Sequence, residues 1–346
     1  MDDLKFGTRD KRGNWAPNAP LSIAPFWEGR WGKMGHFVIE YLWPWNAFHM
    51  AVTLAYWFLL IQPNIEAFQS FNLMWTLILY AVNAGGIFVM YGSIELFYYI
   101  RRKQGTRFKY NAKFPSENPS DVFWFKSQNL DNFLRSFFVA IPIWTLIQVL
   151  FLWCFSNGIH AFGWLGWQDN WVWLVVLTLL VPAIHEVHFF CIHWVIHQQP
   201  LYKWIHSVHH NSINPSPWSS MSMHWVEATA FHAEILWHLL IPSNPIVALF
   251  QMNSTAYGAV NGHIGFEKLE LDGPEGAKTL DSHAYAHYLH HKYFEVNYGG
   301  EGLVPLDKWF GTWHDGSKDS DERMKARFRA KKERLKAKKA SATPAE

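Results

Sequence analysis

The chain has 346 residues, of which 50% are hydrophobic, and its formal net charge at pH 7 is +2. That length would suit two ordinary soluble domains, but so high an apolar share, with 21 Trp and 27 Phe, is typical of a membrane protein. The two cysteines, Cys154 and Cys191, are too few for a disulfide framework. Nothing outside a basic tail favours nucleic-acid binding, so we expect no nucleic-acid partner.

In chain order, a polar or interfacial region over 1–41 comes first. Four apolar stretches follow, and each is long enough to cross a bilayer, for which about 20 residues are needed. Trp and Tyr cluster at their ends, as in the interfacial belts of membrane proteins. We therefore predict four transmembrane helices, near 42–62, 73–100, 135–156 and 171–193.

The charges of the loops indicate one orientation. The 61–72 and 156–170 loops contain no Lys or Arg, whereas the 101–126 loop contains seven. Because basic loops stay in the cytoplasm, both termini and the 101–126 loop are expected there. After four crossings, everything beyond about residue 193 lies on that side too. A further apolar run, 228–250, contains two histidines, a glutamate and two prolines, and we interpret it as a re-entrant or interfacial helical hairpin.

Histidine is the most informative residue type, and 15 of the 19 histidines lie between His185 and His291. The pattern His-x-x-His-His occurs twice, in WIHSVHHN at 204–211 and in AHYLHHKY at 286–293, where composition alone predicts roughly 0.06 copies. A third segment, beginning at His193, has the pattern His-x-x-x-His. Spacings of three and four residues place side chains on one face of a helix, so each segment can direct several imidazoles at one centre.

These three segments provide eight imidazoles, which is too many for one metal ion but suits two. Imidazole binds iron, zinc, copper and nickel, so the ligand type alone does not select the metal. A metal pair at the cytoplasmic end of an apolar helical bundle suits oxidation of a lipid C–H bond, which requires a redox metal. Two alternatives stay open: a two-zinc membrane hydrolase and a metal-binding transporter.

Several motifs in this region resemble those of the fatty acid hydroxylase/sterol desaturase superfamily of membrane di-iron oxygenases. They are HWVIH (193–197), HSVHH (206–210), NGHIGFE (261–267) and HYLHH (287–291), followed by NYGG (297–300) and LDKWFGTW (306–313). The resemblance covers roughly 180–315 in order and spacing. It implies two iron ions, O2 as co-substrate and nine histidine ligands: His193, His197, His206, His209, His210, His263, His287, His290 and His291.

Two acidic residues are candidates for catalytic roles. In several members of the family the third motif continues with a second histidine, whereas this chain has Glu267 there, as either a carboxylate ligand or a partner of a ligand. Glu186 lies seven residues before His193, about 10 Å along a helix. We expect it to hydrogen-bond an imidazole from another helix and not to touch the same metal.

Three further residues are candidates for supporting roles. His283 precedes the second His-x-x-His-His box and is a candidate additional ligand. His224 and Glu227, three residues apart in MSMHWVEA, resemble a family element outside the ligand set, and we interpret them as contacts behind the ligands.

The resemblance implies a membrane-bound oxygenase that hydroxylates or desaturates a lipid, such as a sterol or a fatty acyl chain. We find no flavin or nicotinamide fingerprint and no fused haem domain, so the electrons are expected from a separate carrier of the cytochrome b5 or ferredoxin type. The predicted fold is an all-α integral membrane protein with four transmembrane helices and a cytoplasmic helical catalytic cap that holds a His-rich dimetal site.

The expected regions are the N-terminal region 1–41, a transmembrane region 42–179 with helices 1–3, the start of helix 4 and the basic loop, a catalytic region 180–315, and a basic tail 316–346. The tail has a net charge of +9 between residues 323 and 339. We expect a solvated helix there, with contact to anionic lipid headgroups as the alternative.

Overall fold

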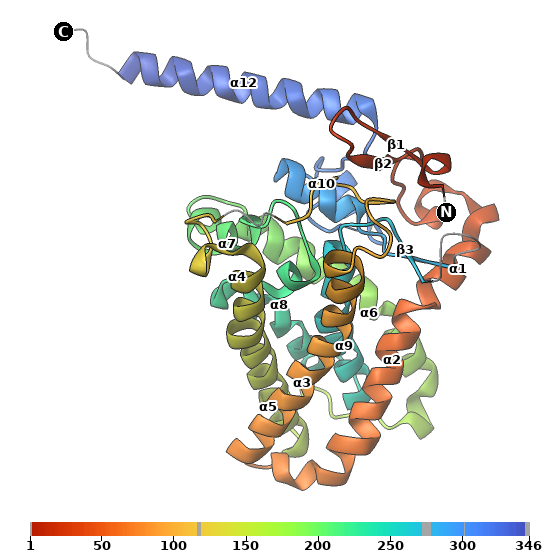
Figure 1. The fold of residues 1–346 in the computed structure, drawn as a ribbon. Helices are drawn as coiled ribbons and strands as arrows, with labels where there is room; N and C mark the ends of the chain where they lie inside the picture. Colours follow the sequence, from red (N-terminus) through yellow and green to blue (C-terminus); the bar gives the residue numbers. More distant parts are fainter. Residues whose placement is uncertain (1, 116–118, 272–277, 301, 343–346) are drawn as a thin grey trace.

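The computed structural model describes residues 2–115, 119–271, 278–300 and 302–342. Helices dominate this part of the chain, and they form a bundle with a smaller cap at one end (Figure 1). Two short antiparallel hairpins depart from the expected all-α fold: β1 (Gly7–Arg9) pairs with β2 (Trp15–Pro17), and β3 (Lys268–Glu270) pairs with β4 (Thr279–Asp281). Residue 1, residues 116–118 of the basic loop and residues 343–346 of the tail lie outside the described residues.

The α-helices are α1 (Met34–Leu42), α2 (Trp45–Ala55), α3 (Leu73–Ile94), α4 (Gln128–Arg135), α5 (Ile141–Ser156), α6 (Trp167–Ile196), α7 (Ser207–His210), α8 (Trp225–His232), α9 (Pro245–His263), α10 (Tyr285–Tyr293), α11 (Leu306–Trp309) and α12 (Lys318–Ala342). Four π-helical segments join them: η4 (Tyr56–Ile61), η6 (Glu95–Ile100), η8 (Ser136–Ala140) and η9 (Tyr202–His206). The 3-10 helices are η1 (Asp3–Lys5), η2 (Pro25–Glu28), η3 (Trp31–Lys33), η5 (Gln62–Phe68), η7 (Trp124–Lys126), η10 (Pro217–Met221) and η11 (Ala233–Leu239).

Among the described residues, three helical segments are long and apolar enough to cross a bilayer: Leu73–Ile100, Gln128–Ser156 and Trp167–Ile196. Large apolar side chains on their outer faces are exposed, including Leu77, Val89 and Phe138. Such a surface suits lipid and not water. The protein is therefore a membrane protein. The first predicted span, near 42–62, is not one of these three segments and is occupied by α2 and η4, which continue one another.

The apolar run after the first histidine box forms a helical hairpin inside the bundle. Its first arm is α8 and η11, and its second arm is α9, most of whose residues are buried. The tip contacts the 161–165 loop, because Ala161 and Leu165 donate backbone hydrogen bonds to Leu239 and Ser243. Both ends of the hairpin lie at the same end of the bundle, so the two histidine boxes meet there, as a re-entrant hairpin requires.

A buried hydrogen-bond network holds the helices together at mid-bundle. Asn83 of α3 accepts from the Tyr56 hydroxyl at 2.6 Å, and its amide donates to Thr145 at 3.0 Å and to Gln148 at 2.9 Å. These partners come from η4 and α5. In an apolar interior each unsatisfied polar group is costly, so this network favours one relative placement of the three segments.

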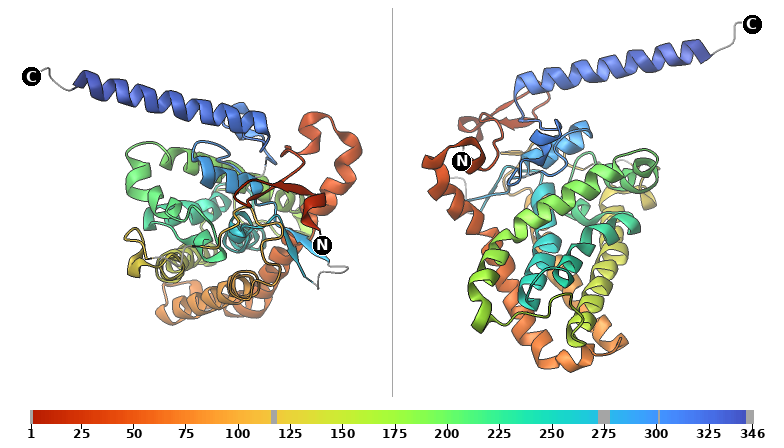
Figure 2. Two further views of the ribbon diagram at one scale, coloured as in Figure 1. Left: turned by 45° about the horizontal axis from the view of Figure 1, so that its top comes forward. Right: turned by 180° about the vertical axis from the view of Figure 1, so that it is seen from behind.

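The cap consists of segments far apart in the sequence. The β1–β2 hairpin lies on the 103–110 segment, with Trp15 donating its backbone N–H to the Lys109 carbonyl. The helix α10 and the β3–β4 hairpin complete the cap above the bundle (Figure 1). Three views show that α12 passes over the cap on the side away from the bundle (Figures 1 and 2).

The network around Asn83 yields a test of the fold. Replacing Asn83 by Leu removes the three hydrogen bonds that this side chain makes with Tyr56, Thr145 and Gln148, which we expect to lower the free energy of unfolding by about 1–3 kcal/mol. The measurement is the thermal unfolding midpoint of the detergent-purified protein. The control is Leu77→Ala on the lipid-facing side of the same helix, which should change the midpoint much less. Equal effects of the two substitutions would contradict the structural role given to the network.

Candidate metal centre

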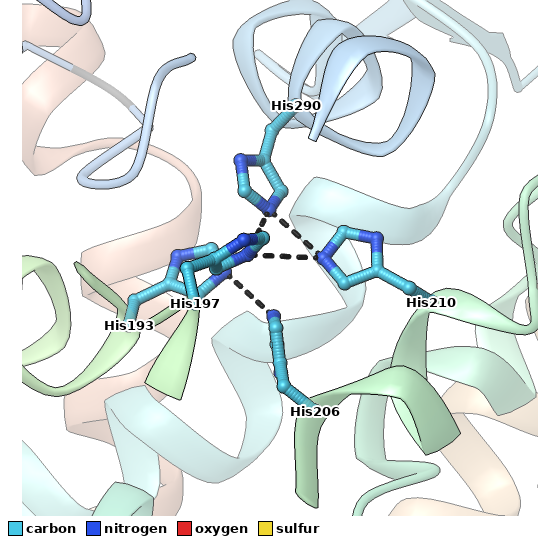
Figure 3. A group of neighbouring side chains, drawn as sticks. All are labelled: His193, His197, His206, His210 and His290. Carbon is cyan, nitrogen blue, oxygen red and sulfur yellow. Dashed lines mark hydrogen bonds between the residues drawn. The ribbon is translucent and has the colours of Figure 1, made fainter. Parts of the chain in front are cut away.

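Nine histidines converge at the end of the bundle next to the cap, and they form two groups. Within each group, one ring nitrogen per residue lies within 4.8 Å of the corresponding nitrogen of every other member. Figure 3 shows the rings of the larger group directed at one another. The larger group is His193, His197, His206, His210 and His290, and the smaller group is His209, His263, His287 and His291. These are the nine histidines that the resemblance implies as ligands.

The two His-x-x-His-His boxes contribute to the groups in a reciprocal way. The first box sends its outer histidines, His206 and His210, to the larger group and its middle one to the smaller group. The second box sends His287 and His291 to the smaller group and its middle one to the larger group. The two outer histidines of a box are four residues apart, so their directions differ by about 40° around the helix axis. The middle histidine points further away from both, so one box can serve two adjacent centres.

In both groups the Nε2 atoms face inward at close range. Within the larger group, the His193–His206 distance is 3.0 Å and the His290–His210 distance is 3.1 Å. Within the smaller group, His263 is 3.1 Å from His209 and from His287. Such convergence of one type of nitrogen is what a metal ion requires.

The opposite nitrogens show which protonation state these rings have. Five Nδ1 atoms lie within hydrogen-bonding distance of an oxygen acceptor. For four of them the acceptor is a backbone carbonyl: that of Tyr298 for His193 (2.7 Å), Val296 for His290 (2.7 Å), Ala259 for His263 (3.0 Å) and Ser222 for His209 (3.3 Å). For His206 the acceptor is the Glu227 carboxylate (2.8 Å). A carbonyl or carboxylate oxygen only accepts, so Nδ1 carries the proton and Nε2 carries a lone pair. In the His193–His206 and His263–His209 pairs, two lone pairs then face each other. A cation between them removes this repulsion, so the residues present fit bound metal.

Burial keeps these imidazoles neutral. Desolvation, and then the neighbouring imidazoles, lower the pKa of His206, His210 and His290 well below the usual range. Burial also lowers the pKa of His209, to about 4. At neutral pH these rings are therefore uncharged, which is the form that binds a metal ion.

Glu227 supports the larger group directly. Its Oε1 accepts from His206 Nδ1 at 2.8 Å, and both side chains are buried. A carboxylate behind a ligand imidazole fixes the tautomer and the orientation of the ring. His224, its expected companion, lies at the start of α8 instead, where Nδ1 accepts from the Val226 N–H at 3.3 Å. His224 is thus a helix cap and not a contact behind a ligand.

Glu186 acts through a loop. Its two carboxylate oxygens accept from the backbone N–H groups of Gly302 and Val304 at 2.7 and 2.8 Å. The same loop carries the Tyr298 carbonyl that holds His193. The two bonds place this carboxylate against the backbone of the loop, whereas we expected it to bond an imidazole of another helix.

Asp307 has a similar role, and the sequence analysis did not identify it. Its carboxylate accepts from the N–H groups of Tyr298 and Gly299, each at 2.8 Å, and from the Thr312 hydroxyl. It therefore holds in place the loop backbone whose Tyr298 carbonyl positions His193. The signal was present as the acid in LDKWFGTW, but nothing in the sequence says that this acid reaches back to NYGG.

Glu267 and His283 lie outside both groups. The Glu267 carboxylate accepts a hydrogen bond from the Tyr110 hydroxyl, and its backbone N–H donates to Phe108. This residue immediately precedes β3, where the chain has already turned away from α9. His283 has a φ of 57° in the turn before α10, which directs the chain into that helix. The geometry thus gives neither residue the position of a ligand.

Comparison with known proteins shows what the centre is similar to. The fatty acid hydroxylase family model matches residues 176–312, which include all nine histidines. A Delta(7)-sterol 5(6)-desaturase of Gibberella zeae is 27% identical over 184 residues, covering 52% of this chain and 54% of the relative. One from Aspergillus fumigatus is 27% identical over 164 residues, covering 41% of this chain and 50% of the relative. Residues 176–312 are therefore similar to the fatty acid hydroxylase/sterol desaturase superfamily.

The superfamily match has defined limits. The chain spans about half the length of the curated relatives that it matches, and the family model covers the region from the middle of α6 to the segment after α11. No solved structure matches the chain. The similarity therefore concerns the histidine groups and their supporting loop, and α1–α5 are described by this structure alone.

The division into two groups predicts the metal content of variants. His209→Ala removes a member of the smaller group and His290→Ala one of the larger group, so each is expected to lower the metal content from about two ions per chain toward one. Metal analysis of the purified protein measures this. Glu267→Gln and His283→Ala serve as controls outside the groups and should retain both ions. Loss of metal in the controls, or full metal in both histidine variants, would contradict the grouping.

A second prediction concerns Glu227. Glu227→Leu removes the acceptor of His206 Nδ1, and we expect metal affinity to fall by about 10–100-fold. Glu227→Gln keeps an oxygen acceptor at the same place and should lose less. Competition with a chelator, followed by metal analysis, gives the affinities. The idea fails if the Leu variant holds metal as tightly as the Gln variant.

Proposed function

We propose that the protein is a membrane-bound lipid oxygenase in which each histidine group holds one iron ion. The observation that supports this most directly is the pair of inward-facing Nε2 sets, next to each other and without a carboxylate among the described residues of either group. Bound iron supplies the redox chemistry with O2 that zinc lacks. Together with the similarity of residues 176–312 to the fatty acid hydroxylase family, this favours oxidation of an unactivated C–H bond.

The overall reaction determines what else the protein needs. Hydroxylation converts a C–H bond, O2, two electrons and two protons into an alcohol and one water. Desaturation uses the same inputs, removes two hydrogens from neighbouring carbons and yields a double bond and two waters. The residues of this chain hold the metals through nine imidazoles, orient those imidazoles through Glu227 and the Tyr298 carbonyl, and exclude bulk water by burial of most of the rings.

The substrate class that we propose is a sterol or a related lipid, because the matched relatives are named as sterol desaturases. The exposed apolar faces of the spans supply the membrane contact that such a substrate requires. Electrons would come from a separate one-electron carrier of the cytochrome b5 or ferredoxin type. The basic helix α12, which passes over the cap, offers an acidic carrier a complementary surface.

We propose the topology from the same charge pattern as before. Four crossings, of which α2 with η4 makes the first, leave both termini and the histidine groups in the cytoplasm. Residues 180–315 then form the catalytic region and 316–346 the basic tail. The alternatives have less support: the two-zinc hydrolase needs a carboxylate base at the metals, and the transporter needs ligands at mid-membrane.

Metal analysis combined with lipid profiling tests this function. We expect about two irons per chain, and cells that contain the protein should accumulate lipids about 16 mass units heavier or about 2 lighter than their precursors. The matched control is the His209→Ala variant, which should insert into the membrane but form no product. Two zincs that iron cannot displace, with no O2-dependent product, would overturn the proposal.

A further inference from the structure

A second set of buried polar side chains lies inside the bundle, apart from the metal groups. They come from α2, α6, α8 and η11, elements that meet around α9. Polar and ionisable groups at such a depth are costly and mark functional sites by default. We refer to the following four residues as the buried polar cluster: His49, His185, His232 and Glu234.

Direct contacts connect two members of the cluster and place the others beside them. His185 Nδ1 lies 2.8 Å from Glu234 Oε2 and 3.2 Å from the Thr255 hydroxyl of α9. The His232 ring lies 5.1 Å from the Phe231 ring, which in turn lies 5.9 Å from the His185 ring. The His49 ring lies against α9 at Gly258, where a Cβ would be 3.3 Å from the ring. The cluster is thus one local environment built from separate helices.

Much of the hydrogen-bonding capacity of this cluster is unused. Among the residues that the structure describes, the ring nitrogens of His49 and His232 and the Oε1 of Glu234 have no hydrogen-bond partner. These three side chains are at least 97% buried, at 3%, 1% and 0% exposure respectively. Leaving such groups unpaired costs about 1–3 kcal/mol each, so packing alone does not favour them. Groups that both donate and accept suit a ligand that does both.

The position of the cluster relative to the metal groups suggests which ligand that is. His185 lies eight residues before His193 on α6, about 12 Å along the helix. Phe189 lies between them, 5.9 Å from the His185 ring and 4.6 Å from the His193 ring. Phe231 packs on both His185 and Phe189. One layer of aromatic side chains therefore separates the cluster from the proposed irons.

The cluster is not sealed from the outside. The His185 side chain is 31% exposed, whereas its partner Glu234 is fully buried. A molecule that reaches His185 therefore meets the polar groups next. In a chain with apolar outer faces at this depth, that molecule is a lipid.

We propose that the buried polar cluster binds the hydroxyl group of a lipid alcohol while the carbon skeleton of the same molecule reaches the histidine groups. This inference rests on the proposed function and specifies its substrate class. Because the cluster and His193 are about 12 Å apart along α6, the hydroxyl and the reacting carbon of the ligand must be separated by about that distance, and the fused-ring skeleton of a sterol is long enough to span it. In this arrangement the hydroxyl donates to and accepts from imidazole nitrogens of the cluster. Phe189 and Phe231 contact the part of the carbon skeleton that lies between the cluster and the histidine groups.

The test measures binding and not turnover. The probes are a fluorescent sterol with a free hydroxyl and the methyl ether of the same sterol, each titrated against the detergent-purified, metal-loaded protein. The ether cannot donate a hydrogen bond and is bulkier at that oxygen. We expect the wild-type protein to bind the free alcohol about tenfold more tightly than the ether.

Two substitutions locate the preference in the cluster. His232→Phe keeps the stacking of the ring on Trp144 (6.0 Å) but removes both ring nitrogens. His49→Phe likewise removes both ring nitrogens from the ring that lies beside Gly258. Each should reduce the tenfold preference to about twofold or less. The matched control is His188→Phe on the same helix as His185, because both nitrogens of His188 are already bonded to Ala230 and Trp237. That variant should keep the preference.

The possible outcomes separate this inference from the proposed function. Equal binding of alcohol and ether by the wild-type protein overturns the inference, and so does a preference that survives in both cluster variants. Binding of neither probe overturns it as well. In all three cases, iron content and O2-dependent lipid conversion still test the proposed function independently. If one variant does not fold, the wild-type comparison and the other variant decide.

Discussion

The rest of the structure depends on one constraint: imidazole nitrogens whose lone pairs point at each other repel unless a cation lies between them. Five ligand candidates have Nδ1 directed at an oxygen acceptor, so their Nε2 atoms present lone pairs to one another at close range. Without a cation this arrangement is repulsive, and with one it becomes a ligand shell. The acceptors come from elements as distant as α8, α9 and the loop after α10. The fold of the cap can thus be understood as a means of placing carbonyl and carboxylate oxygens behind histidines.

The repeated histidine pattern follows from this constraint. Two adjacent centres need ligands from both sides, and a helix that lies beside both can divide three histidines between them. Each box gives two rings to the nearer group and one ring to the other, with the assignment reversed between His209 and His290. A substitution in either box therefore affects one group through its own ring and the other through its neighbours. That is a physical reason to expect the two groups to lose function together.

Spacings of three and four residues on a helix allowed eight of the nine histidines to be predicted as ligand candidates, and the family resemblance added His263. The sequence did not predict their division between the groups, which depends on how α7, α9 and α10 cross. The sequence also did not predict that the loop with Tyr298 holds His193, because Asp307 contacts Tyr298 only after the chain has turned back. Glu267 was misleading because its position in the third motif suggested a ligand, whereas the chain enters β3 there and the carboxylate meets Tyr110. The polar cluster was visible only as scattered histidines in apolar runs.

One helix connects all these parts. On α6, His193 faces the larger histidine group, Glu186 anchors the loop that orients His193, and His185 faces the buried polar cluster. Movement of α6 along its axis would displace all three contacts together. Because Glu186 accepts hydrogen bonds from two backbone N–H groups of the loop, this acid resists such movement. A molecule held at the cluster would therefore lie at a fixed depth below the histidine groups. The helix then determines which carbon of a bound lipid comes closest to them.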